Sequence, residues 1–251
     1  MAAAAVFAFL GGLLIGSFLT VVAHRVPRRE SIVGPRSRCT ACGVQIAAYD
    51  NLPVVSWLVL GGRARCCGAG ISKRYPLTEL AVGILFLVTV VVLWGEAWEV
   101  ALGLVFVSAL VAVTLTDLEL KVIPNRILLV ATAFALAIVA LGDPGSFPER
   151  LAAATAAGGL LFIAALAYPQ GMGLGDVKLA AVMGLYLGRS VAPALLVALF
   201  AGSVVGLAII VREGPAARKR GIPFGPFLAL GGIVGLLAGN ELIDLYLDTF
   251  A

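Results

Sequence analysis

Apolar residues form eight long stretches along the chain, and shorter polar segments separate them. A helix of about 20 apolar residues crosses the roughly 30 Å of hydrocarbon in a bilayer. The stretch at 179–187 is too short for this unless it continues through Gly188 and Arg189 or neighbouring helices cover it. We therefore expect an all-α polytopic membrane protein with about eight transmembrane helices. The stretches cover residues 4–23, 77–94, 100–116, 127–141, 151–168, 179–187, 191–211 and 226–242.

The overall composition agrees with this pattern. Residues of the hydrophobic classes make up 61% of the chain, and the mean hydropathy is +1.06. Ordinary soluble domains are well below this apolar fraction. The composition therefore excludes a soluble globular protein.

The positive charges predict the orientation in the membrane. No Lys or Arg precedes the first stretch, whereas Arg25 and Arg28 follow it, which is the reverse of the charge order in a signal peptide. If the eight spans alternate, 16 of the 18 Lys and Arg residues lie inside, and only Arg150 and Arg189 lie outside. We expect a multi-pass protein of the cytoplasmic (inner) membrane with both termini outside. Anionic lipids of the cytoplasmic leaflet account for the net charge of +4, without nucleic acid.

One polar segment is large enough to fold by itself. It lies between the first and second apolar stretches and contains all four cysteines. The predicted organisation is a first transmembrane helix at 1–23, a cytosolic Cys-containing loop subdomain at 24–76, and a membrane-embedded domain at 77–251.

The cysteines suggest a structural zinc site. Cys39 and Cys42 form a CxxC pattern, and Cys66 and Cys67 follow after a gap that suits a second half-site. Cytosolic thiols stay reduced, which favours a metal over disulfides, and a small subdomain gains stability from a bound ion. Adjacent cysteines do not easily serve one tetrahedral ion in knuckle geometry, so unliganded thiols or redox pairs remain an alternative.

Two aspartates lie at the ends of apolar stretches. A carboxylate at a membrane boundary is costly unless it is paired or functional. Asp117 ends the third stretch and Asp176 precedes the sixth, so both are expected at the same depth on the cytoplasmic side. Three glycines within 171–175 lead into Asp176, and glycines allow a second chain to approach closely. The two residues are candidates for one site.

Two nearby carboxylates can hydrolyse a bond by sharing a proton. One stays protonated and donates to the scissile carbonyl, while the other takes a proton from water. The only histidine is His24, which leaves little for a Ser/His or Cys/His nucleophile system, and the helical zinc-protease motif is absent. A purely structural reading is that Asp117 pairs with Lys121 while Asp176 caps the following helix.

Several ordered motifs over nearly the whole chain resemble those of type IV prepilin peptidases, a family of GxGD-type intramembrane aspartyl proteases. They are Gly16-Ser-Phe-Leu19, His24-Arg-Val-Pro27, Asn51-Leu-Pro-Val-Val-Ser-Trp57, Ile71-Ser-Lys-Arg-Tyr-Pro-Leu-Thr-Glu-Leu80, Asp117 with Ile123-Pro-Asn125, Gly173-Leu-Gly-Asp176 and Ile222-Pro-Phe-Gly-Pro-Phe227.

The resemblance implies that Asp117 and Asp176 are the catalytic pair of an aspartic endopeptidase. Family members cut a short basic leader from prepilins or pseudopilins of type IV pilus and protein secretion systems, after a glycine at the cytoplasmic membrane face. Members with the large first loop often also methylate the new amino terminus with S-adenosylmethionine. This chain departs from the pattern at Ala64, where the family has the first cysteine of its second knuckle, and at Thr20, where asparagine is common.

Two other functions are compatible with aspartates at the ends of apolar stretches. Aspartates can relay protons in a proton- or ion-coupled transporter, although such groups usually lie near the bilayer midplane between related halves. They can also act only as helix caps in a structural subunit of a pilus or secretion apparatus. The placement of both aspartates at one face favours the protease.

Overall fold

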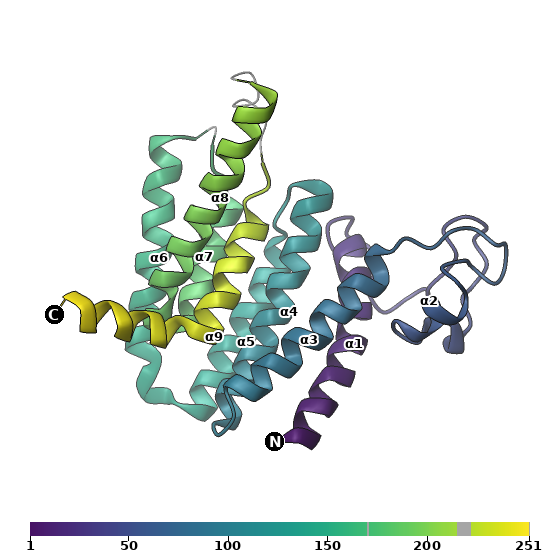
Figure 1. Cartoon of the computed structure of the whole chain (residues 1–251), viewed down its shortest axis with the longest axis horizontal. Coiled ribbons are helices and arrows are strands. Elements are labelled where there is room, and N and C mark those ends of the chain that lie inside the picture. Colours follow the sequence, from purple (N-terminus) through teal and green to yellow (C-terminus); the bar gives the residue numbers. More distant parts are fainter. Residues whose placement is uncertain (170, 215–221, 251) are drawn as a thin grey trace. The chain divides into compact units, whose positions relative to one another are not determined.

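The computed structural model describes residues 1–169, 171–214 and 222–250, so the basic residues at 218–220 lie outside the described part. Its contacts divide the chain into two compact units, Met1–Trp94 and Gly95–Ala251 (Figure 1). Helices dominate both units, as the apolar pattern predicts.

Unit 1 is a pair of packed helices with a polar subdomain between them in sequence. The pair is α1 (Ala2–Arg25) and α3 (Arg74–Val92), and the subdomain contains η1 (Ala48–Asn51) and α2 (Val55–Val59). A Cβ added to Gly12 would lie 2.8 Å from the Cα of Gly83, and one added to Gly16 would lie 2.7 Å from the Cα of Glu79. Glycines at these positions therefore let the backbones of α1 and α3 approach closely.

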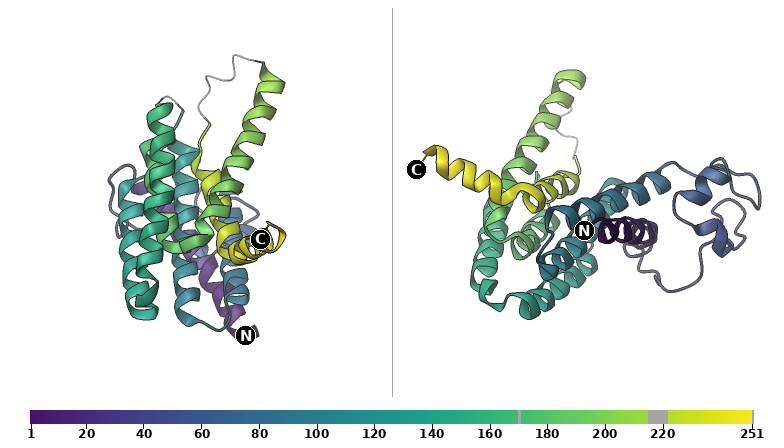
Figure 2. Two further views of the ribbon diagram at one scale, coloured as in Figure 1. Left: turned by 90° about the vertical axis from the view of Figure 1, so that its left-hand side faces the viewer. Right: turned by 60° about the horizontal axis from the view of Figure 1, so that its bottom comes forward.

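Unit 2 contains the remaining helices (Figure 2). Its most extensive helix–helix packing joins α6 to α7, α8 to α9 and α4 to α5. Their bounds are α4 (Ala97–Leu120), α5 (Asn125–Gly142), η2 (Pro144–Ser146), α6 (Phe147–Ala167), α7 (Leu174–Leu187), η3 (Gly188–Ser190), α8 (Val191–Glu213) and α9 (Gly225–Phe250).

Seven described helical stretches are long and apolar enough to cross a membrane, compared with the eight in the sequence prediction. The difference lies in Leu174–Glu213, which contains both α7 and α8. Glycines 232 and 235 of α9 face Met183 and then Leu187 of α7, so α7 and α9 run parallel.

The glycines of α9 also show that α8 runs the other way. Gly231 faces Ala194 and Ala198, whereas Gly239, further along α9, faces Ser190 at the start of α8. The chain therefore reverses at η3, and α7 and α8 are two separate passes. The predicted stretch at 179–187 is a helix of 14 residues, about 21 Å long at 1.5 Å per residue. Helices α5, α6 and α9 cover it, as so short a pass requires.

Gly184 makes the closest approach between α6 and α7. A Cβ at this position would lie 2.4 Å from the backbone nitrogen of Ala154. We expect Gly184→Ala to destabilise the protein by about 1–3 kcal/mol, since the backbones must separate to admit the methyl group. Thermal unfolding in detergent measures the change. Gly159→Ala is the matched control, because that position has open space, and an equal effect of both substitutions would contradict the packing argument.

Candidate active site and cysteine site

The carboxylate of Asp117 is held by the beginning of another helix. Asp117 lies buried in the last turn of α4, which ends at Leu120 before Pro124. Its Oδ2 accepts a hydrogen bond of 2.8 Å from the backbone N–H of Gly225, the first residue of α9. A helix N-terminus offers free N–H groups and a partial positive charge, both of which suit a carboxylate. The start of α9 therefore fixes the orientation of Asp117.

Asp176 is held by its own glycine-rich segment. It is the third residue of α7 and is also buried, and its Oδ2 accepts a hydrogen bond of 3.2 Å from the backbone N–H of Gly173. This bond is half of a capping box, so the helix-capping role considered from the sequence is present. A cap fixes the carboxylate in one position and leaves its other oxygen available for chemistry.

The structure brings the surroundings of the two aspartates together at one end of unit 2. Gly175, in the turn before Asp176, packs against Ile123, where an added Cβ would lie 3.0 Å from the Cβ of the isoleucine. The Nζ of Lys178 donates a hydrogen bond of 3.0 Å to Oδ1 of Asn125. These contacts join the start of α7 to the connection that follows α4, which ends with Asp117 in its last turn.

Gly225 is a site residue to which the sequence assigned no role. Its backbone N–H links the start of α9 to a candidate catalytic side chain, that of Asp117. Sequence motifs report the chemistry of side chains, so they do not reveal a backbone donor that lies 108 positions from its acceptor. The available signal was the Pro223-Phe-Gly-Pro226 pattern, in which a glycine between prolines marks a required close approach.

The four cysteines form one cluster in unit 1. Their sulfur atoms all lie within 4.8 Å of one another. The Sγ–Sγ distances are 3.7 Å between Cys39 and Cys67, 3.3 Å between Cys42 and Cys66, and 3.9 Å between Cys66 and Cys67. The adjacent cysteines do reach a common centre, contrary to the difficulty expected from the sequence.

Two turns of the same geometry carry these cysteines. In the first, Arg38 and Gln45 form an antiparallel bridge; in the second, Arg63 and Gly70 do. The N–H of Gly43 donates to the carbonyl of Cys39 at 2.8 Å, and in the corresponding place Gly68 donates to Ala64 at 2.7 Å. Ala64 therefore occupies the position equivalent to Cys39, as the family pattern indicated.

Cys66 supplies the fourth sulfur from a different position of the second turn. It lies two residues after Ala64, where the first turn has Ala41. Because Cys66 and Cys67 both point into the cluster, the second turn keeps two thiols despite the alanine.

The surroundings of the thiols favour a bound cation. Backbone N–H groups, first that of Cys42 and then that of Ala41, lower the pKa of Cys39 to about 6. The neighbouring Cys42 sulfur, followed by burial, raises the pKa of Cys66 to about 12. Cys39 is therefore ready to bind as a thiolate, whereas Cys66 needs a cation to offset the crowding of sulfur atoms.

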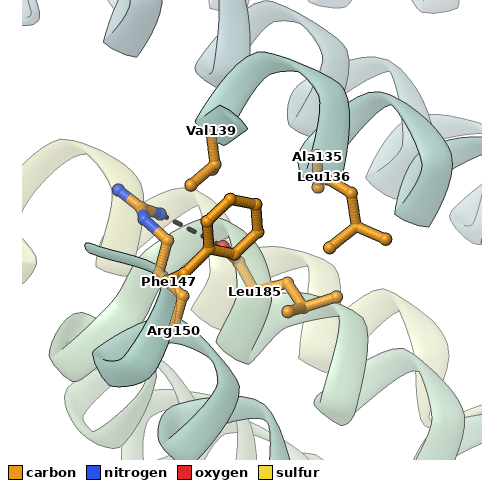
Figure 3. A pocket seen from close by; sticks show the side chains of 6 residues that line it. All are labelled: Ala135, Leu136, Val139, Phe147, Arg150 and Leu185. Carbon is orange, nitrogen blue, oxygen red and sulfur yellow. Dashed lines mark hydrogen bonds between the residues drawn. The ribbon is translucent and has the colours of Figure 1, made fainter. Parts of the chain in front are cut away.

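A hollow between α5, α6 and α7 lies at the other end of α7 from Asp176 (Figure 3). It leaves no room for a water molecule. The guanidinium of Arg150 beside it donates to the backbone oxygens of Leu185 and Tyr186, at 3.1 and 2.6 Å. This hollow is a packing feature that anchors the end of α7. Its lining residues are Ala135, Leu136, Val139, Phe147, Arg150 and Leu185.

Comparison with known proteins separates the same two parts of the chain. The family model described as Bacterial Peptidase A24 N-terminal domain matches residues 10–93, and the model described as Type IV leader peptidase family matches residues 104–211. A protein of Bacillus subtilis (strain 168), named prepilin leader peptidase/N-methyltransferase, is 34% identical over 242 residues, covering 95% of this chain and 96% of the relative. The chain belongs to the type IV leader peptidase family.

Other relatives support the family membership over almost the full length. The protein of the same name from Stutzerimonas stutzeri is 34% identical and covers 94% of this chain and 91% of the relative. The protein of the same name from Aeromonas salmonicida (strain A449) is 35% identical, and the match covers 96% of this chain and 93% of the relative. No solved structure matches the chain significantly. The chain is thus an enzyme of the predicted family, which disfavours the transporter and the structural subunit.

Proposed function

We propose that the protein is an intramembrane aspartyl endopeptidase that removes the leader from prepilins or pseudopilins with Asp117 and Asp176. The observation that carries this is the pair of buried carboxylates at one end of unit 2, each held by a backbone N–H from a glycine-containing segment. The family and the names of the relatives support this substrate class.

The chemistry follows from two carboxylates that share one proton. The ionised carboxylate takes a proton from water, whose oxygen attacks the scissile carbonyl, while the protonated carboxyl donates to the carbonyl oxygen. The tetrahedral intermediate then collapses as the leaving nitrogen takes up a proton and the peptide bond breaks. The bond from Gly225 keeps Asp117 in place through these steps.

The reaction is assigned to the cytoplasmic face of the inner membrane. Under the positive-inside rule, both aspartates lie at that boundary and both termini lie outside. A leader that is basic and cytosolic presents its cleavage point at the same depth. The substrate is a hydrophobic helix, and its partners in the reaction are the lipid bilayer and the enzyme.

A cleavage assay tests the proposal. Purified protein in detergent micelles or nanodiscs is mixed with a prepilin, and mass spectrometry follows the loss of the leader. We expect a shorter product with one new amino terminus, and no product when the scissile glycine is replaced. Intact prepilin together with proton flux in liposomes would instead support the transporter.

We also propose that unit 1 carries N-methylation. The relatives' names combine two activities, and both aspartates lie in unit 2 within the peptidase match, whereas a separate family model covers unit 1. In this reaction a methyl group leaves the sulfonium of S-adenosylmethionine, the co-substrate. It forms a bond with the amino nitrogen, which loses a proton, and S-adenosylhomocysteine is released.

The four cysteines are proposed to hold a structural zinc ion. Tetrahedral zinc with Zn–S bonds near 2.3 Å places its sulfur atoms about 3.8 Å apart, and the observed separations of 3.3, 3.7 and 3.9 Å lie around that value. Four thiolates close the coordination shell, so the ion would join the two turns and stabilise the subdomain.

The position of the fourth ligand gives a specific prediction. Structural zinc sites contribute about 10–16 kcal/mol, so losing one thiolate of four is expected to weaken binding roughly a hundredfold. We expect Cys66→Ala to show this loss in a competition titration with a chelator. The double variant Ala64→Cys with Cys66→Ala restores a sulfur at the position equivalent to Cys39 and should recover the affinity. Unchanged zinc binding in the single variant would contradict the role of Cys66.

A further inference from the structure

The backbone of unit 1 has an unusual turn at Val54. This residue has φ 61° and ψ −50°, and the N–H of Val55 donates to the carbonyl of Pro53 at 2.6 Å. These values describe the rare γ-turn with positive φ. Such a conformation is unfavourable for a β-branched residue, so other contacts must hold it in place.

A carboxylate from a membrane helix holds this turn. The N–H of Val54 donates a hydrogen bond of 2.7 Å to Oε2 of Glu79, in α3. Glu79 is only 7% exposed, and a buried carboxylate requires hydrogen-bond partners. Ser56 stabilises the chain just before the turn, because its hydroxyl accepts a hydrogen bond from the N–H of Leu52 and donates one to the carbonyl of Tyr49.

A continuous set of contacts leads from Glu79 to the cysteine cluster. The γ-turn begins α2, and Trp57 of α2 donates from its indole N–H to the carbonyl of Ile71 at 3.1 Å. The N–H of Ile71 in turn donates to the carbonyl of Gly62, next to the second cysteine turn. At the other end, Gly16 of α1 lies against the backbone of Glu79. The cysteine subdomain is thereby tied to the α1–α3 pair.

We propose that Glu79 is a positioning residue for N-methyl transfer, acting by holding the Val54 turn. The proposal rests on the methylation assigned to unit 1 above. Methyl transfer needs the donor sulfur, the methyl carbon and the amine nitrogen in line, so it depends on the placement of the subdomain relative to the helix that enters the membrane. Peptide cleavage depends on unit 2 and does not need this turn.

Two substitutions test the length and the charge of the Glu79 side chain separately. Glu79→Gln has the same length and keeps an oxygen that accepts from Val54, but has no charge. Glu79→Asp keeps the charge but is one methylene shorter and cannot reach. Each purified variant is given a prepilin and S-adenosylmethionine, and mass spectrometry measures the cleaved and the methylated products in one sample.

We expect Glu79→Asp to lower the ratio of methylated to cleaved product about tenfold or more, because even small misplacements of reacting groups have large effects on rate. In Glu79→Gln the same ratio should stay within about twofold of the wild-type value. Val54→Pro abolishes the turn without touching α3, because proline has no N–H to donate and cannot adopt φ 61°; it should reproduce the selective loss if Glu79→Asp does not fold. Full methylation in Glu79→Asp, or loss in Glu79→Gln, overturns the proposal. Absence of methylation in the wild-type protein would instead refute the proposed second activity.

Discussion

Asparagine in place of either Asp117 or Asp176 is expected to reduce leader cleavage about a thousandfold. General acid–base catalysis by a positioned side chain contributes about 10²–10⁴-fold to rate, and an amide can neither take up nor release the shared proton. Asparagine keeps the shape of the side chain and an oxygen that can accept from Gly225 or Gly173. Initial rates with saturating prepilin measure the loss.

Two controls separate chemistry from misfolding. Asp143→Asn changes an aspartate that follows α5, at the other end of that helix from Asn125, and should leave cleavage unchanged. Methylation of a prepilin already cut by the wild-type enzyme should survive in both active-site variants, because that activity is assigned to unit 1. Retention of normal cleavage in either variant would refute the dyad.

Gly225→Ala is expected to lower the cleavage rate by about ten- to a hundredfold. The added Cβ would lie 2.8 Å from Oδ2 of Asp117 and 3.2 Å from its Cγ. Contacts this short force the carboxylate or the start of α9 to move, and displacement of a catalytic group by about 1 Å can cost a hundredfold. The same prepilin assay provides the measurement, with kcat expected to change more than KM.

Gly206→Ala is the matched control for this change. The nearest atom to its added Cβ is Cδ1 of Ile222, at 4.0 Å, so the methyl group fits without displacement. Equal rates for the Gly225 variant and the wild-type protein would show that the contact between α9 and Asp117 does not position the carboxylate.

The helices could be predicted from the sequence because lipid imposes long apolar runs with polar ends. The prediction at 127–141 corresponds to α5 (Asn125–Gly142), and that at 191–211 to α8 (Val191–Glu213). Helix α9 was predicted to end at 242 but continues to Phe250, since charged residues after Asn240 end the apolar run without ending the helix. Helix continuity depends on backbone propensity, which an apolar count does not measure.

The candidate site could be predicted only in part, because some of its groups come from distant backbone. The two aspartates stand out as charges beside apolar segments, whereas the N–H of Gly225 belongs to a helix start 108 residues from its acceptor. The arrangement of the cysteine cluster could also be predicted only in part. The repeated turn geometry shows that Ala64 occupies the position equivalent to Cys39 and that Cys66 brings its sulfur into the cluster, which spacing alone left open.

The two ends of α7 are restrained to different degrees. At its C-terminal end, Arg150 binds two carbonyls, the hydroxyl of Tyr186 donates to Ala131 at 2.6 Å, and its ring stacks on Phe106. At the other end, Lys178 donates a hydrogen bond to Asn125 and Gly175 packs against Ile123. The contacts at the C-terminal end thus anchor α7 at the end that is far from Asp176. We expect that any tilt of α7 pivots at this anchored end, so that its displacement is largest near Asp176.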